Sequence, residues 1–148
     1  MTKQRLQQAF TLFELLLSMS LLAMVAAFSV PLYQSFQTSN DLELTADITT
    51  QSLRRAQSLA MSGDGDANWG VYIQNGSVTL FQGDDYATRD TSFDEDLEIS
   101  DKINLSGLSE LVYEKFTGDP SATGTINLSI ASGETRIITI NSRGTVDF

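Results

Sequence analysis

The chain has 148 residues and a hydrophobic content of 41%, which allows one domain of ordinary size with an extension. It contains no Cys and no His, which excludes disulfides, thiol nucleophiles, imidazole bases and the commonest zinc sites. Nine basic and nineteen acidic side chains give a net charge of −10. Because DNA binding needs clustered Lys and Arg side chains, we expect no nucleic-acid partner. The absence of Cys and His leads us to expect that the chain is not an enzyme.

The N-terminal stretch 10–32 is apolar almost throughout, and Glu14 is its one ionisable residue. An α-helix needs about 20 apolar residues to cross about 30 Å of hydrocarbon, so this stretch is predicted to be a transmembrane helix. Lys3 and Arg5 precede it, which orients the span with its N-terminus in the cytoplasm. A carboxylate in such a helix is costly, so we expect Glu14 to have a partner.

Two spacings in this stretch resemble the class III leader of type IV pilins and type II secretion pseudopilins. In that family a short basic leader ends in a small residue, usually Gly. The mature chain then starts with Phe and has Glu as its fifth residue and Pro as its twenty-second. Here Ala9 is the small residue, Phe10 to Glu14 is F-T-L-F-E, and Pro31 is residue 22 counted from Phe10. Ala9 stands where the family normally has Gly.

The resemblance implies that residues 1–9 are a leader peptide, which a prepilin peptidase removes between Ala9 and Phe10. The same enzyme then methylates the new amine of Phe10. Removing Lys3 and Arg5 leaves seven basic and nineteen acidic side chains, a net charge of −12. When helices pack into a filament, the Glu14 carboxylate can pair with the Phe10 amine of a neighbour, because an opposite charge favours the charged form of each group.

The resemblance also implies a non-enzymatic structural subunit, a minor pilin or pseudopilin, of a type IV pilus-like or type II secretion filament. Such a subunit is a single-pass protein of the inner (cytoplasmic) membrane before it enters an extracellular or periplasmic filament. Its partners are other pilin or pseudopilin subunits, the prepilin peptidase and an inner-membrane assembly platform. A major pilin of the same class is an alternative.

A different class of protein also fits part of the N-terminus. An ordinary signal peptide has a basic start, an apolar middle and a small-residue cleavage site, and here residues 25–27 (Val-Ala-Ala) before Phe28 supply such a site. A plain membrane anchor is a further reading. In either case the rest of the chain would be a secreted or membrane-anchored β-sandwich binding module.

After the apolar stretch, Pro31 cannot donate to the helical hydrogen-bond ladder, and we predict a helix kink there. Residues 33–62 form the second, amphipathic half of the helix. Six residues recur at spacings of three and four, as expected for one buried face. They are Leu42, Ala46, Thr49, Leu53, Ala56 and Ala60. The helix is predicted to end near Ser62, where Gly63 supplies a C-cap.

The globular body, 67–148, is predicted to begin with a β-hairpin. Two β-branched and aromatic runs, 69–74 and 77–82, are separated by Asn75-Gly76, the dipeptide of a type I′ turn. The acidic segment 83–101 is expected to be a solvated loop. Because carboxylate oxygens suit calcium and pseudopilins of the major type carry that ion, a calcium site is its alternative; we expect no other cofactor. The segment 64–68 starts like an EF-hand loop but has Trp69 and Asn75 where Gly and Glu are needed.

Further strands are predicted at 102–105, 110–116, 125–130, 136–140 and 145–148, as an antiparallel meander. The fold class is therefore α+β, with a long N-terminal helix packed on an antiparallel β-sheet. Trp69 is expected to be a core residue, and Gly144 to supply the positive φ of a turn. On the segments 55–57 and 138–146, the body resembles H-type pseudopilins and FimT-like minor pilins.

Overall fold

A computed structural model describes residues 10–148, with the exception of the side chains of residues 28–32. The chain divides into two compact units, of which the first ends at Gln37 and the second runs from Thr38 to Phe148. Residues 1–9, the predicted leader, lie outside the described residues.

A single α-helix, α1 (Leu12–Ser62), begins in the first unit and ends in the second. Gly63 follows it with a φ of 69°, and its N–H donates to the carbonyl of Ala60 at 3.0 Å. This left-handed glycine is the C-cap predicted from the sequence. Pro31 lies inside the helix and does not end it; a kink at this residue stays a prediction.

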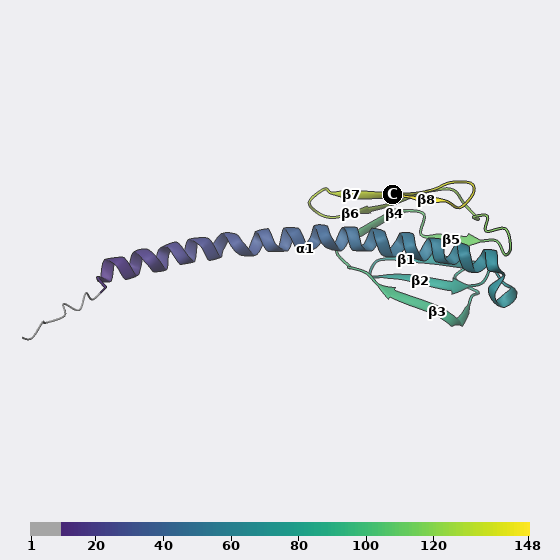
Figure 1. The fold of residues 1–148 in the computed structure, drawn as a ribbon, viewed down its shortest axis with the longest axis horizontal. Helices are drawn as coiled ribbons and strands as arrows, with labels where there is room; N and C mark the ends of the chain where they lie inside the picture. The colour runs from purple at the N-terminus through teal and green to yellow at the C-terminus, as the bar shows by residue number, and fades with distance from the viewer. Residues whose placement is uncertain (1–9) are drawn as a thin grey trace, which may run out of the picture. The chain divides into compact units, whose positions relative to one another are not determined.

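The second unit contains a short 3₁₀ turn and two four-stranded antiparallel sheets (Figure 1). The turn is η1 (Asp64–Asp66). The first sheet has the order β3-β2-β1-β5 and consists of β1 (Trp69–Gln74), β2 (Ser77–Gln82), β3 (Asp90–Glu98) and β5 (Glu110–Tyr113). The second has the order β4-β6-β7-β8 and consists of β4 (Asn104–Gly107), β6 (Gly124–Ser129), β7 (Thr135–Ile140) and β8 (Val146–Asp147).

The sheet topology confirms the predicted hairpin and corrects the predicted meander. β1 and β2 pair from Trp69↔Gln82 to Gln74↔Ser77, and Gly76 has the positive φ, 89°, that the turn requires. The later strands do not follow one another in a single sheet, because β5 pairs with β1 whereas β4 pairs with β6. Strand patterns report which residues are extended, but they do not report which strands pair across long connections.

The prediction of a solvated loop at 83–101 is also corrected, since this acidic segment contains the nine-residue strand β3. β3 pairs with β2 from Ser77↔Glu98 to Gln82↔Asp90, with a register shift near Leu80. It is the edge of its sheet, and eight of its nine residues are exposed. Charged side chains on an edge strand prevent pairing with other chains, so an acidic composition is compatible with a strand in this position.

The second half of α1 lies alongside both sheets and closes the core between them (Figure 1). All six residues of the predicted helical face, Leu42 to Ala60, are fully buried. Trp69 is also buried, and its indole N–H donates to the Asp64 carbonyl at 2.9 Å. Gly144 has a φ of 72°, and a side chain there would collide with Gln57 and Tyr113. The predicted core face and both structural roles are confirmed.

Leu53 and Leu44 lie on opposite sides of the same helix and provide a matched test of this core. Leu53 is fully buried, whereas the side chain of Leu44 is 55% exposed. Leu53→Ala should lower the free energy of unfolding by about 2 to 5 kcal/mol, and Leu44→Ala by less than about 0.5 kcal/mol. Urea unfolding of the full chain in detergent, followed by the fluorescence of Trp69, measures both. Equal losses would contradict the assigned helix face.

Tyr113 predicts how the core responds to alkali. It is fully buried, and its hydroxyl has no hydrogen-bond partner among the described residues. Burial raises the pKa of Tyr113. The stability that depends on its neutral form is therefore present below the usual tyrosine pKa of about 10 and is lost as the pH rises above it.

Tyr113→Phe removes both the unpaired buried hydroxyl and the group that ionises at high pH. At neutral pH it should raise the free energy of unfolding by about 1 kcal/mol, because an unpaired buried hydroxyl is lost. The loss of stability between about pH 7 and about pH 11 should be smaller than in the parent, since one buried tyrosine no longer ionises on unfolding. The same urea titration at the two pH values checks this, and an unchanged alkaline loss would refute it.

Candidate functional site

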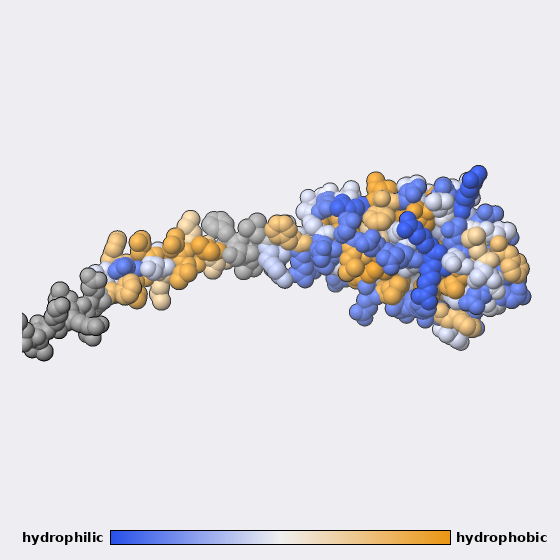
Figure 2. All heavy atoms as spheres, viewed as in Figure 1, coloured by the Kyte–Doolittle hydropathy of each residue, from blue (hydrophilic) through white to orange (hydrophobic). Residues whose placement is uncertain are grey.

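The first unit presents an apolar helical surface that no described residue buries. Every residue from 10 to 27 is exposed. Its large apolar side chains range from 50% exposed at Leu15 to 79% at Phe10, and Figure 2 shows hydrophobic residues along this segment. A helix that is apolar on all sides needs lipid or other helices around it. Among the residues that the structure describes, no helical segment combines the length and the apolar character that a membrane crossing requires.

The start of α1 shows a cap that the sequence interpretation missed. Thr11 immediately precedes the helix, and its hydroxyl accepts a hydrogen bond from the Glu14 N–H at 3.2 Å. Thr11 and Glu14 therefore occupy the N-cap and N3 positions of a T-x-x-E capping pattern. That pattern is visible in the sequence and locates the first turn of the helix. Glu14 is also the acidic residue of this turn, where the helix dipole favours a negative charge.

The structure places the predicted site residues as follows. Phe10 and Glu14 are both exposed; Phe10 precedes α1, and Glu14 lies in its first turn. Within the described part of the chain, the Glu14 carboxylate forms no ion pair. Ala9 lies outside the described residues, and Pro31 lies in the helix with its side chain outside the description. The cleavage, methylation and pairing roles of these residues stay predictions.

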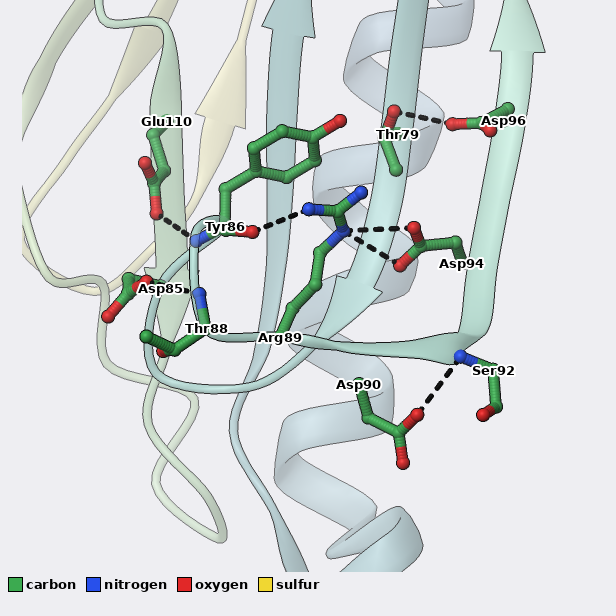
Figure 3. Close-up of polar contacts among 10 residues, drawn as sticks. All are labelled: Thr79, Asp85, Tyr86, Thr88, Arg89, Asp90, Ser92, Asp94, Asp96 and Glu110. Atoms are coloured by element: carbon green, nitrogen blue, oxygen red, sulfur yellow. Dashed lines mark hydrogen bonds and ion pairs between the residues drawn. The ribbon is translucent and has the colours of Figure 1, made fainter.

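The acidic loop before β3 is packed against the sheet through Arg89 (Figure 3). The Arg89 Nε donates to both carboxylate oxygens of Asp94 at 3.0 and 2.9 Å, and its Nη1 donates to the Tyr86 carbonyl at 2.6 Å. The guanidinium carbon lies 3.6 Å from the centre of the Tyr86 ring. Both charges of the Arg89–Asp94 pair are largely shielded from water, so this contact holds the loop more firmly than a surface pair would.

The Tyr86 ring covers the face of the first sheet that points away from the main core. It stacks on Tyr72 with the ring centres 3.9 Å apart and contacts Phe81 edge-on at 5.6 Å. Phe81 is fully buried, and its ring lies so close to Gly70 that a side chain there would collide with it. The Tyr86 N–H also donates to the Glu110 carboxylate at 2.8 Å. The predicted solvated loop is therefore a packed cover over β1 and β2.

Several carboxylates of the segment 83–101 accept hydrogen bonds from the protein itself. Arg55 donates to both oxygens of Glu95 at 2.6 Å, and Thr79 donates to Asp96 at 2.6 Å. The amide of Thr88 and the amide of Ser92 donate to Asp85 and Asp90, respectively, and these bonds lower the pKa of each carboxyl group. Their stabilising effect is present above the usual carboxyl pKa of about 4 and is lost as the pH falls through the lowered value.

No group of three or more acidic, Cys or His side chains is placed to hold a metal ion in the part of the chain that the structure describes. A polar hollow of about 540 Å³ lies between η1 and the start of the acidic segment. In its lining, Lys115 forms an ion pair with Asp66 at 2.8 Å, and the Asn68 side-chain amide donates a hydrogen bond to Asp84 at 2.7 Å. A calcium site in the acidic segment stays the alternative to a segment without a cofactor.

Comparison with protein families locates a motif at the N-terminus. Residues 4–30 match the family model of the prokaryotic N-terminal methylation motif. The chain carries a pilin-type N-terminus. The matched residues include the predicted cleavage junction, Glu14 and most of the exposed apolar segment. The predicted resemblance to pilins and pseudopilins is confirmed for this segment.

Comparison with solved structures finds a similar fold. The minor pseudopilin EpsH from the type 2 secretion system of Vibrio cholerae is similar to this chain, with a TM-score of 0.54 and 16% sequence identity. The match covers 72% of this chain and 94% of the EpsH chain. At this identity the similarity establishes the fold, and the predicted α+β class is confirmed. No curated protein matches the sequence significantly.

The hydrogen bonds of the acidic segment predict its response to calcium. Carboxylates of this segment already accept hydrogen bonds from Arg55, Arg89 and a backbone amide, so calcium has to displace these donors before it can bind there. Adding calcium or a chelator to the full chain in detergent should leave the midpoint of urea unfolding unchanged. Trp69 fluorescence measures the midpoint, and magnesium is the control ion. A rise with calcium alone would establish the calcium site instead.

Proposed function

We propose that this chain is a structural subunit, a minor pilin or pseudopilin, of a type IV pilus-like or type II secretion filament. The observation that carries the proposal is the methylation motif of residues 4–30, which coincides with an apolar helix that the chain does not cover. The pseudopilin-like fold of the body supports it. The subunit performs no catalysis and acts by packing its helix against neighbouring pilin-type subunits.

In this proposal the chain is made as a prepilin with its N-terminus in the cytoplasm. A prepilin peptidase cuts between Ala9 and Phe10 and methylates the new amine. The apolar segment holds the subunit in the inner membrane until an assembly platform moves it into the filament. A bend at Pro31 gives the helix flexibility, and the β body faces outward from the filament.

Glu14 fixes the register between neighbouring helices. Glu14 is exposed on the first turn of α1, and its carboxylate forms no ion pair with any described residue. The carboxylate therefore remains available for the Phe10 amine of an adjacent subunit. A pair of this kind in an apolar environment is a weak source of net stability, but it penalises any register that leaves one charge alone.

The basic residues of the body support the absence of a nucleic-acid partner. Arg55 forms its ion pair with Glu95, and Arg54 donates to the Val146 carbonyl at 3.0 Å. The two adjacent cations of the helix are therefore engaged within the body. Phosphate binding would require breaking these contacts in a chain with a net charge of −10.

Glu14→Ala tests the assembly mechanism. Leaving the Phe10 amine unpaired among apolar helices costs about 3 to 5 kcal/mol, so incorporation into the filament should fall more than a hundredfold. Asp47→Ala removes another acid of α1 and is the matched control, with normal incorporation expected. The amount of protein in sheared or sedimented filaments gives the result.

Mass spectrometry of the mature N-terminus accompanies this experiment. In both variants the chain should start with N-methylated Phe10, which shows that processing is intact. A mature chain starting at Phe28, or an uncut Met1, would support a binding module with an ordinary signal or anchor. Normal incorporation of a correctly processed Glu14→Ala protein would disprove the pairing role.

A further inference from the structure

A groove runs between α1 and the edge strand β3 in the second unit. It consists of two adjoining hollows of about 280 and 240 Å³, and Ile48 lines both. Leu44 and Ile99 line the first hollow, and Leu80 and Leu97 line the second. Leu44 is 55% exposed and Leu97 is 39% exposed, so the groove has an apolar surface that is open to solvent.

The groove arises because β3 lies at the edge of its sheet, where α1 no longer covers the inner face completely. Leu97 and Glu95 pair in register with Val78 and Leu80, two core residues, and so point to the helix side of the sheet. The bidentate Arg55–Glu95 pair connects α1 to β3 at one end of the groove. Each hollow is smaller than the roughly 300 to 1,000 Å³ of ligand pockets, and therefore suits a single side chain.

The charges at the rim restrict what can enter the groove. Asp41 and Glu98 line the first hollow, and Glu95 lines the second. Among the described residues that line the two hollows, Arg55 is the one cation, and it is already paired with Glu95. An acidic segment would be repelled by these carboxylates. An uncharged segment with large apolar side chains avoids that repulsion and can pack against the apolar floor formed by Leu44, Ile48 and Leu97.

One segment of the chain has these properties. Tyr33 and Phe36 are 71% and 75% exposed, and their spacing of three residues places them on one side of α1. Residues 33–37, Y-Q-S-F-Q, contain no charged side chain. Aromatic residues just beyond an apolar stretch are typical of the membrane interface, so a subunit that leaves the bilayer must find another cover for these rings.

We propose that Tyr33 and Phe36 of one copy dock in the α1–β3 groove of a second copy, a contact that rests on the proposed function because it forms between adjacent subunits in the filament. The two rings enter the two hollows, and the acidic rim excludes acidic surfaces. The contact adds to the packing of the apolar helices and couples the position of each body to the helix of its neighbour.

The test places a photoreactive benzophenone analogue of phenylalanine at position 36 of the full-length protein in cells that assemble the filament. Irradiation should give a product with the mass of two copies. Peptide mapping should show that position 36 of one copy is cross-linked to a residue within 44–48 or within 95–99 of the other. The same analogue at Phe148, which is 52% exposed, is the control and should not label the groove.

A second pair of variants tests the groove from its other side. Leu44→Glu adds an acid to the groove and should reduce the two-copy product at least tenfold. Ile137→Glu adds an acid at a side chain of similar exposure, 51%, on β7 and should leave the product unchanged. Trp69 fluorescence verifies that both variants are folded.

The outcomes separate this contact from the proposed function. If the protein enters filaments but the label is found on lipid, on another protein or outside the groove, the docking proposal is wrong and the proposed function stands. An unchanged product with Leu44→Glu also overturns the docking proposal. If the processed protein is absent from filaments, both proposals fail.

Discussion

One helix must satisfy two different surroundings, and the rest of the structure depends on how it does so. From Leu42 to Ala60 its apolar face is fully buried by the two sheets, whereas residues 10–27 are exposed within the described part of the chain. Eleven large apolar side chains from Phe10 to Val25 are exposed. At about 1.5 to 3 kcal/mol for each buried side chain, covering them is worth on the order of 20 kcal/mol. This exceeds the usual stability of a folded domain, about 5 to 15 kcal/mol.

The acid within this apolar segment is explained by comparing two energies. Glu14 lies in the first turn of α1 beside the Thr11 cap, where a negative charge gains about 0.3 to 1 kcal/mol from the helix dipole. A carboxylate in an apolar helix costs about 2.5 to 3.5 kcal/mol at the centre of a bilayer. The local benefit is smaller than the cost, so the helix cap alone does not account for the acid. This difference is the reason for proposing a cationic partner from another subunit.

Carboxylates in the acidic segment of the body also have cationic partners, and here the partners belong to the same chain. Arg89 holds Asp94 and covers the Tyr86 ring, and Arg55 holds Glu95 on the edge strand. The charges of β3 protect a long free edge, and the loop before it buries Phe81. A segment that reads as solvated in the sequence therefore stabilises both faces of the first sheet.

The sequence by itself determined the features that depend on local chemistry. The helix end at Gly63, the buried face of α1, the first hairpin and the N-terminal motif each follow from residue types at fixed spacings, and each is confirmed. The cap formed by Thr11 and Glu14 was also available from a local pattern but was overlooked. Only the tertiary structure decided that β5 returns to β1, that β3 is a strand and that the groove beside it is open. These features depend on contacts between residues far apart in the chain, and local periodicity carries no information about which distant partner will cover a given face.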